Sequence, residues 1–505
     1  MSKIQKIFTI APLGLQGILV EVEANLSRHL PKVILVGLPD AAVQEARERV
    51  WAAIENSELH FPRQKIVVNL APAQIRKEGG AYDLAIAISI LQVSEQIELP
   101  DEPIAFIGEL SLSGTVKPVP GALVMVSALQ NLGFKKVFVP ADNAQEVAII
   151  RDIEIFPVNN LGQLVAHLQN RELIQSEALL EFKPEPSKAA IDLAEIKGQA
   201  QAKRVLEIVA AGGHNVLLVG PPGAGKSMLA KAFLSLLPPL NLSEALEISK
   251  IYSAAGLLSA ECPLITARIL RAPHHSASVA SIVGGGSWPR PGEISLAHHN
   301  VLFLDEILEF PRIILESLRQ PLEDKVITVS RVKGSLDFPA NFILLATANP
   351  CPCGYLTDQE KKCQCSPLDV KRYQKRMSGP LLDRIDLHLQ VDKVKTRDLS
   401  ANNHEVQSSA TVQKKIIATR QIQLQRFQSQ KLNADMSNKL VKKHCQLSRD
   451  SQQVLQQAAD RLQLSARGYF KVLKVARTIA DLEGRADIIE ADILEALLYR
   501  GRIFE

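Results

Sequence analysis

The sequence contains no apolar run of about 18 residues, the length that a membrane-spanning helix requires. Its first residues, Met-Ser-Lys-Ile-Gln, also lack the basic and then apolar order of a secretory signal. Only six of the 505 residues are cysteines, and a reducing cytosol disfavours disulfides between them. These absences argue against a membrane or secreted class, and we expect a cytoplasmic protein with no membrane partner.

The excess of one sign of charge over the other is also small. The formal net charge is +4, which is too small to indicate nucleic-acid binding unless basic residues are concentrated locally. The length suggests about three domains, and a hydrophobic content of 46% is ample for packed cores. Composition therefore indicates a multidomain globular protein, and its function has to be inferred from motifs.

A glycine-rich motif directly follows the apolar segment 215–219, which has the length of a buried parallel strand. It matches G-x-x-x-x-G-K-[ST] and consists of Gly220, Pro221, Pro222, Gly223, Ala224, Gly225, Lys226 and Ser227. Glycines let backbone amides surround a phosphate, Lys226 adds a cation near the β- and γ-oxygens, and Ser227 can ligate Mg²⁺. The motif predicts a P-loop for a nucleotide and Mg²⁺; the alternative is a turn that binds nothing.

Two further apolar segments end in polar residues that could serve the same nucleotide. Segment 301–304 is followed by Asp305, which suits Mg²⁺, and by Glu306, which suits polarising an attacking water. Segment 342–346 leads to Asn349, whose amide could orient that water. Taken alone, such acids more often mark a solvated strand end, and such an asparagine a loop cap. Behind a P-loop we favour the catalytic interpretation.

Together these residues resemble an AAA+ ATPase with Glu306 as catalytic base and Asn349 as sensor 1. Further motifs resemble the magnesium-chelatase-like branch, and the YifB/ComM proteins match along essentially the whole chain. The motifs lie at 271–278, 284–286, 291–298, 319–324 and 378–386. The resemblance implies an αβα core with a helix-2 insertion and a pre-sensor-1 hairpin, followed by a C-terminal α-helical lid.

The same resemblance implies a homohexameric, ATP-driven motor on single-stranded and branched DNA, as in branch migration during natural transformation. A protein remodeller of the magnesium-chelatase subunit type is the alternative. Arg384 resembles an arginine finger that reaches the neighbouring subunit, and Arg467 resembles sensor 2, so that each ATP site would span two chains. A surface salt bridge and a contact at a helix start are their plainer alternatives.

The N-terminal part, residues 1–180, alternates short apolar strands with helical stretches and is expected to be α/β. It resembles the Lon-protease-like domain of ribosomal S5 type. Where Lon has its serine nucleophile and lysine base, this chain has Ala81 and Leu123, so we expect a scaffold without a catalytic dyad. A linker follows, and we expect the AAA+ core at 185–393 and a helical lid with a basic helical insertion at 394–505.

Four of the six cysteines lie close together after the predicted sensor 1: Cys351, Cys353, Cys363 and Cys365. Paired cysteines are typical zinc ligands, although structural zinc sites more often use C-x₂-C than the C-x-C spacing seen here. The sequence leaves two interpretations open, a Zn²⁺ site and a loop with unbridged cysteines.

Two basic regions could contact DNA. Segment 326–339 has the β-branched composition and Gly-Ser turn of a hairpin, with Arg331 and Lys333 near its tip, where they could meet phosphates without reading sequence. Segment 397–443 holds nine basic and three acidic residues. Solvated surface charge is the alternative for both.

Overall fold

The structure is a computed structural model that describes residues 6–187, 191–259, 261–286, 289–331, 334–394 and 408–501. The chain forms two compact units. Unit 1 comprises Met1–Lys183 together with Leu242–Thr266, and unit 2 comprises Pro184–Asn241 together with Ala267–Glu505. Within the described residues, no helix is both long enough and apolar enough to cross a membrane.

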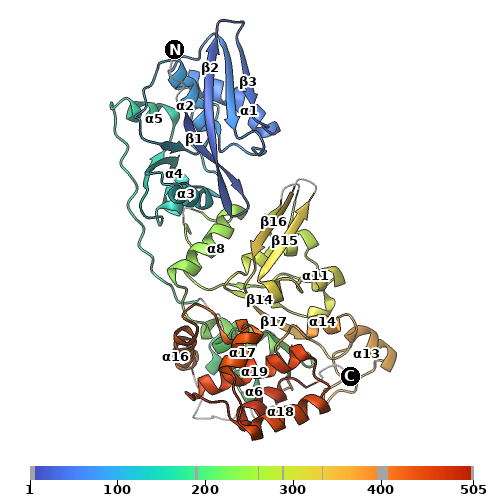
Figure 1. Cartoon of the computed structure of the whole chain (residues 1–505). Coiled ribbons are helices and arrows are strands. Elements are labelled where there is room, and N and C mark those ends of the chain that lie inside the picture. The colour runs from blue at the N-terminus through green and yellow to red at the C-terminus, as the bar shows by residue number, and fades with distance from the viewer. Residues whose placement is uncertain are drawn as a thin grey trace. The chain divides into compact units, whose positions relative to one another are not determined.

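Unit 1 contains a mixed seven-stranded sheet of order β3-β4-β2-β1-β5-β8-β9, of which β1, β2 and β3 are labelled in Figure 1. Its strands are β1 (Ile7–Leu13), β2 (Gln16–Ser27), β3 (Lys32–Val36), β4 (Lys65–Ala71), β5 (Ile104–Phe106), β8 (Lys136–Pro140) and β9 (Glu154–Val158), beside a small ribbon of β6 (Glu109–Leu110) and β7 (Val116–Lys117). Strands β1, β5, β8 and β9 run parallel, whereas β2 is antiparallel to both β1 and β4.

Helices cover both faces of this sheet. They are α1 (Ala41–Asn56), α2 (Asp83–Val93), α3 (Ala122–Asn131), α4 (Ala141–Val147) and α5 (Leu161–Leu168), and a further helix of unit 1, α8 (Leu242–Ala255), packs on α3. Successive side chains of β8 point to opposite faces of the sheet. Phe138 packs in the apolar cluster that includes α1, α2 and α5, whereas Val137 and Val139 pack in the cluster that includes α3 and α4. In this mixed α/β unit, Ala81 and Leu123 are both buried core residues.

Segment 242–266 joins unit 1 although it lies in sequence between the P-loop and Asp305. Its helix α8 places Ser253 against Glu146, and the backbone N–H of Leu123 donates to both side chains at 3.3 Å and 3.1 Å. Leu264 packs in an apolar cluster with Leu123 and Ile149. Buried hydrogen bonds and apolar contacts together fix the segment on the N-terminal module.

Unit 2 contains a five-stranded parallel sheet of order β11-β14-β17-β10-β18. The strands are β10 (Val216–Val219), β11 (Leu270–Arg271), β14 (Val301–Leu304), β17 (Ile343–Ala348) and β18 (Leu387–Gln390). All residues of β10 and β14 are buried, as the apolar composition of central parallel strands predicts.

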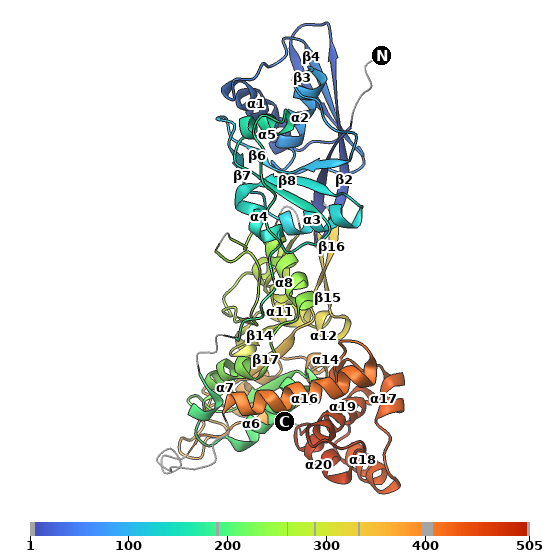
Figure 2. The same cartoon turned by 90° about the vertical axis from the view of Figure 1, so that its left-hand side faces the viewer.

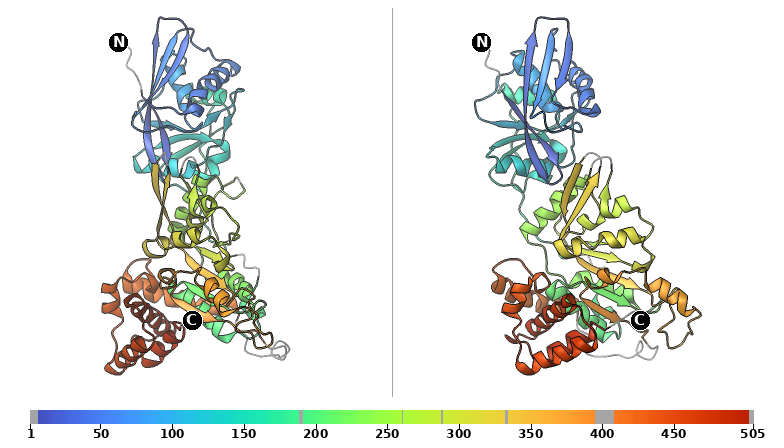
Figure 3. Two further views of the ribbon diagram at one scale, coloured as in Figure 1. Left: turned by 90° about the vertical axis from the view of Figure 1, so that its right-hand side faces the viewer. Right: turned by 45° about the vertical axis from the view of Figure 1, so that its right-hand side comes forward.

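Helices surround this sheet, and others form a C-terminal bundle, labelled in Figure 2 and coloured orange to red in Figure 3. Those around the sheet are α6 (Ala200–Gly212), α7 (Lys226–Phe233), α9 (Val279–Val283), α10 (Glu293–Leu296), α11 (Arg312–Ser317), α12 (Pro321–Asp324), α13 (Pro367–Gln374) and α14 (Gly379–Leu382). The bundle contains α16 (Ser409–Phe427), α17 (Asn438–His444), α18 (Arg449–Arg461), α19 (Ala466–Leu482) and α20 (Glu490–Leu498).

Serine caps mark the starts of α16, α17, α18 and α19. Ser408, Ser437, Ser448 and Ser465 each accept a backbone N–H three residues further on. One apolar cluster then runs from the sheet through α6 and α7 to α19 and α20. The bundle and the sheet therefore share a core.

Two short ribbons complete unit 2. Strands β12 (Gly284–Gly285) and β13 (Arg290–Pro291) pair, and β15 (Val326–Arg331) pairs antiparallel with β16 (Gly334–Pro339). The second ribbon is the hairpin expected from the β-branched sequence between the second and third apolar segments.

Candidate functional site: a P-loop at the carboxyl edge of the sheet

The parallel sheet of unit 2 delivers the predicted nucleotide residues to one edge. Val219 at the end of β10 pairs with Ala348, and Leu304 at the end of β14 pairs with Ala346. The residues that follow these strands, Gly220, Asp305 and Asn349, therefore leave the sheet on the same side.

The P-loop backbone has the form that a phosphate cradle needs. Gly223 and Gly225 have φ of 78° and 84°, values that other residues rarely adopt. A Cβ on Gly220 would lie 2.1 Å from the carbonyl oxygen of Val391, so only glycine fits there. Helix α7 begins at Lys226 directly after the loop, so its N-terminal amides and dipole face the same space. The loop fits a nucleotide phosphate.

Lys226 lies within the loop. Its Nζ donates to the carbonyl of Gly220, to that of Pro221 at 3.0 Å and to Oδ1 of Asn349 at 3.2 Å. Burial lowers the pKa of Lys226 to about 8, although Asp305 and Glu306 oppose that shift. A phosphate would supply the negative charge that the three neutral acceptors lack.

The predicted Mg²⁺ ligands lie in contact. Ser227 Oγ donates to Oδ2 of Asp305 at 3.0 Å, and the other oxygen of Asp305 accepts from the hydroxyl of Thr347. The same Thr347 hydroxyl accepts the backbone N–H of Glu306 at 3.0 Å. Hard oxygen ligands in such a pair suit Mg²⁺. Glu306 itself is exposed, with φ of 53°, so a sharp bend of the backbone presents its carboxylate.

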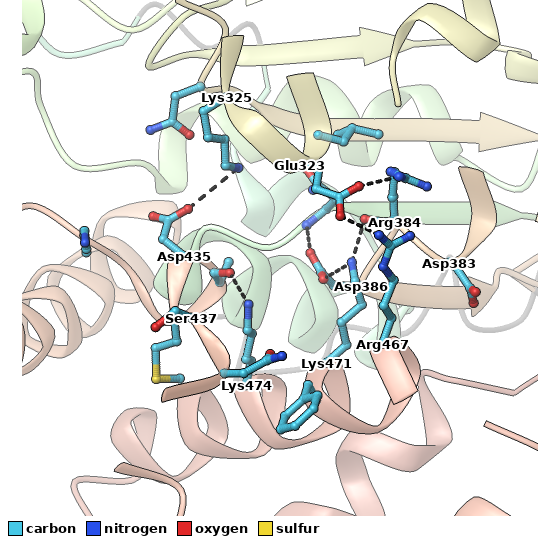
Figure 4. Close-up of a pocket in the computed structure, with 18 of the residues that line it drawn as sticks. Glu323, Lys325, Asp383, Arg384, Asp386, Asp435, Ser437, Arg467, Lys471 and Lys474 are labelled. Atoms are coloured by element: carbon cyan, nitrogen blue, oxygen red, sulfur yellow. Dashed lines mark hydrogen bonds and ion pairs between the residues drawn. The ribbon is translucent and has the colours of Figure 1, made fainter. Parts of the chain in front are cut away.

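Arg384 and Arg467 lie together on Glu323. Arg467 Nη2 donates to one oxygen of Glu323 at 2.6 Å, and Arg384 Nη2 donates to the other oxygen (Figure 4). Arg384 also donates to the carbonyl of Pro380 at 2.8 Å. They border a pocket of about 1090 Å³ whose described lining includes no P-loop residue.

A buried ion pair supports this pocket. Asp386 accepts from Lys471 Nζ at 2.6 Å and from the backbone N–H of Asn215 at 2.8 Å (Figure 4). Lys471 also donates to the carbonyl of Arg384 at 2.6 Å. The pair therefore connects β10, the Arg384 turn and α19. Seven lysines and arginines and four acids line the pocket, so it is electropositive.

The four clustered cysteines converge. The Sγ atom of Cys353 lies 3.4 Å from that of Cys351 and 3.6 Å from that of Cys363. All four sulfur atoms, including that of Cys365, lie within 4.8 Å of one another. Tetrahedral zinc with Zn–S bonds of about 2.3 Å would place its sulfurs about 3.8 Å apart. The cluster is compatible with zinc.

The two predicted basic regions differ. Arg331 ends β15 opposite Gly334, and Lys333 lies outside the described residues. In the second region, two cations of α16 form ion pairs with acids of the same chain: Lys415 pairs with Glu207 at 2.9 Å, and Arg426 pairs with buried Asp481. Helix α16 is therefore a packing element of unit 2 rather than a freely solvated helix.

Two residues that the sequence analysis passed over organise the site. Thr347 connects Asp305 with Glu306, and Glu323 joins Arg384 with Arg467. Thr347 could have been found from the pairing of two parallel strands, because it directly follows the residue opposite Leu304. No local signal marks Glu323, since its partners are 61 and 144 residues away.

Comparison with protein families agrees with this architecture. The family described as "Magnesium chelatase, subunit ChlI" matches residues 192–399. "Subunit ChlI of Mg-chelatase" matches residues 22–143, and "Magnesium chelatase, subunit ChlI C-terminal" matches residues 406–500. The chain therefore belongs to the magnesium-chelatase family of AAA+ proteins.

Within that family the chain is YifB/ComM-like. It is 40% identical to the Competence protein ComM of Haemophilus influenzae over 506 residues, covering 98% of this chain and 97% of ComM. It is 41% identical to the protein YifB of Escherichia coli over 501 residues, covering 98% and 96%. A Lon protease of Rhizobium meliloti is 29% identical over 145 residues, 28% of this chain and 17% of that protein. Membership of this family implies use of ATP and Mg²⁺.

Stability of unit 2 should fall as the pH drops from about 6.5 to about 4. His214 is fully buried and bonds Thr478 of α19 at 2.8 Å; burial lowers its pKa to about 4, against partial opposition from Asp386. Because the unfolded chain binds the proton near pH 6.5, the free energy of unfolding decreases as pH falls through that window, by up to about 1.4 kcal/mol per unit.

Urea unfolding at several pH values measures this slope, and His214→Gln should make it shallower. His29→Gln, at an exposed position, is the matched control and should keep the wild-type slope. An identical pH dependence in His214→Gln and wild type would contradict the assignment.

Proposed function

We propose that the chain is a cytoplasmic, ATP-driven DNA motor that works as a homohexameric ring on single-stranded and branched DNA, as in branch migration during recombination. The observation that carries the ATPase part is the contact network of Ser227, Asp305, Thr347 and Glu306 beside the P-loop. Mg²⁺ held by Ser227 and Asp305 would withdraw charge from the β- and γ-phosphate oxygens.

Glu306 is the proposed general base. Its carboxylate would accept a proton from the attacking water, whose oxygen bonds to the γ-phosphorus while the bond to the β-phosphate oxygen breaks. Lys226 would exchange its carbonyl acceptors for phosphate oxygens, and Asn349, which already contacts Lys226, would orient the water. Thr347 would hold both carboxylate-bearing residues in place.

The arginine pair supports a ring. Arg384 and Arg467 share Glu323 in an electropositive pocket with no P-loop residue in its described lining, so they are suited to a second chain's nucleotide. A γ-phosphate from the neighbouring subunit would compete with Glu323 for both guanidinium groups. Each ATP site would then use residues of two chains.

DNA as the substrate rests on two observations. One full-length relative is named a competence protein, which implicates DNA uptake. The other is the hairpin of β15 and β16: Arg331 ends β15, and Lys333 lies in sequence between the two strands. The matches to the magnesium chelatase subunit favour a second candidate, an ATP-driven protein remodeller. Stimulation of ATP hydrolysis by single-stranded or branched DNA distinguishes the first candidate from the second.

The Walker residues should separate binding from hydrolysis. Lys226→Ala should abolish nucleotide binding, because the loop loses its only cation near the β- and γ-phosphates. Glu306→Gln should still bind ATP but hydrolyse it about 10²- to 10⁴-fold more slowly, because a positioned general base is lost. Equilibrium binding and steady-state phosphate release measure the two effects. Wild-type turnover in Glu306→Gln would contradict the assignment.

Mixed rings should reveal action between subunits. An arginine finger contributes about 10³- to 10⁵-fold to turnover, so Arg384→Ala and Lys226→Ala proteins should each be inactive alone. Mixed together, they should recover part of the activity at interfaces that combine one intact P-loop with one intact arginine. The measurement is ATPase rate against mixing ratio, and absence of recovery in rings shown to be mixed would argue against this arrangement.

The hairpin cations should contribute affinity without sequence preference. The Arg331→Ala/Lys333→Ala double variant should bind DNA more weakly to a similar extent across sequences and show a salt slope smaller by about one per lost contact. Nucleotide binding should persist. Fluorescence anisotropy over a salt series measures the slope, with Lys371→Ala, at an exposed position of α13 outside both basic regions, as control. Unchanged DNA affinity would exclude the hairpin from the DNA path.

The cysteine cluster is proposed to hold one structural Zn²⁺. Purified protein should contain about one zinc per chain by elemental analysis, and Cys353→Ser or Cys365→Ser should lose it because three thiolates bind less tightly than four. Cys262→Ser, at an exposed cysteine outside the cluster, should keep the metal. A metal-free preparation with full ATPase activity would favour the loop of unbridged cysteines.

A further inference from the structure

The sheet of unit 1 has one open edge. Strand β3 (Lys32–Val36) ends the strand order, and β4 is its strand partner among the described residues. At the other end of the sheet, the carbonyl of Ile155 in β9 accepts the backbone N–H of Glu177 at 2.7 Å, so a later segment already hydrogen-bonds that strand. Alternate residues of an edge strand direct their backbone N–H and C=O groups outward, where a further strand can bind them.

The composition of β3 favours such pairing. Val33 and Leu35 pack against the apolar cluster that includes α1 and α2, whereas Lys32, Ile34 and Val36 alternate with them and face the other side of the sheet. Val36 is 39% exposed. Edge strands usually avoid pairing by means of a charge or a proline within the strand. The three central residues of β3 carry neither, because Lys32 lies at its first position.

The two ends of β3 carry opposite charge. At its start, Lys32 lies directly opposite Lys65 of β4, and Arg28 precedes them by four residues. Like charges that face each other across two strands are unfavourable unless an acid approaches. Beyond the other end, Asp40 caps α1, and exposed Glu45 lies in the same helix. The edge is therefore basic at one end and acidic at the other.

A two-fold axis through Ile34 makes this edge complementary to itself. In antiparallel pairing about that axis, Lys32 lies opposite Val36 of the second copy, and the basic end of each copy meets the acidic end of the other. The exposed side chains of Leu30 and Leu38 flank the strand at opposite ends, so they too meet at the same end of the pair. Parallel pairing would instead bring the two basic ends together.

The register follows from the faces of the sheet. With Ile34 at the centre, all five residues of β3 are paired, and core-facing side chains of both copies stay on one side. A shift by one residue would turn them to opposite faces, and a shift by two would leave two of the five residues unpaired.

We propose that the β3 edge is a self-association surface that binds the β3 strand of a second copy of this chain, antiparallel about a two-fold axis through Ile34. The contact is isologous, because the same residues lie on both sides of it. It uses unit 1 alone and requires neither nucleotide nor the arginine pocket. A two-fold contact cannot repeat around a ring of equivalent subunits. In the proposed hexamer, on which only this last step rests, it therefore joins two rings.

Charge at position 36 tests the antiparallel register. Because this position lies opposite Lys32 of the second copy, Val36→Glu adds two attractive cross-strand pairs to each contact and Val36→Lys adds two repulsive ones. The Kd of self-association should be about tenfold higher in Val36→Lys than in Val36→Glu. Sedimentation equilibrium of the full-length protein without nucleotide measures it, and any ring formation affects both variants equally.

The matched control is a second pair of charge variants in unit 1. Leu173→Lys and Leu173→Glu, at an exposed position away from β3, should self-associate with equal Kd. Far-UV circular dichroism of all four variants checks that the fold is kept.

Cysteine substitution tests the position of the axis. In the proposed register the two copies of residue 34 have Cα atoms about 4.5 to 5.5 Å apart, within the range of a disulfide. In a Cys262→Ser background, Ile34→Cys should therefore give a linked dimer with oxidised glutathione, which is reduced to two thiols as the disulfide forms. Lys32→Cys, at a more exposed position but at least about 13 Å from its copy, should not. Non-reducing electrophoresis measures the linked fraction, and the Cys262→Ser parent gives the background.

Equal Kd values in Val36→Lys and Val36→Glu overturn the inference, and so does cross-linking of Lys32→Cys that matches that of Ile34→Cys. None of these measurements uses ATP hydrolysis or DNA. Their failure therefore leaves the proposed function intact, and an inactive P-loop leaves the β3 contact intact.

Discussion

The buried Asp386 carboxylate is the interaction on which the arrangement of unit 2 depends. It accepts the backbone N–H of Asn215, the residue that leads into β10 and the P-loop, and it pairs with Lys471 of α19. Removing one partner of a buried ion pair leaves the other charge uncompensated, which is strongly unfavourable. Arg384 lies two residues before Asp386, and Arg467 lies four residues before Lys471 on the same helix. The P-loop strand and both candidate arginines are thus positioned from a single carboxylate.

The P-loop and the arginine pocket, the two parts of the proposed ATP site, therefore both depend on Asp386 for their positions. The P-loop leaves the sheet at the carboxyl edge, whereas the arginine pocket is lined by residues around the start of β10, Asn215 included. A displacement of α19 would move Lys471 and, through its ion pair, Asp386 and Asn215. His214 reinforces the connection through its hydrogen bond to Thr478, so this bond and the Asp386–Lys471 ion pair both join the core to the bundle, which share one apolar cluster.

Local sequence patterns predicted the elements whose chemistry lies in consecutive residues. The P-loop, the Asp305-Glu306 pair, the hairpin at 326–339 and the group of four cysteines each occupy a short stretch, and the structure brings the members of each together. What the sequence could not show are contacts between distant stretches. Three contacts depend on strand order and loop course, for which a single sequence has no local code: Glu323 between Arg384 and Arg467, Thr347 between the Asp305 carboxylate and the Glu306 backbone N–H, and residues 357–360 beside the P-loop.

The segment 242–266 has a consequence for how the protein can be divided. The backbone passes between the two units at residues 183–184, 241–242 and 266–267, so three chain connections, not one, join the N-terminal unit to the rest. A fragment that ends at the linker would lack α8 and would bare Leu123, Ile149 and the buried Glu146 to water. Such a fragment would expose an apolar face to other chains, and exchanging the N-terminal module between relatives would require exchanging this internal segment with it. The N-terminal module and segment 242–266 therefore have to be kept together in any such exchange.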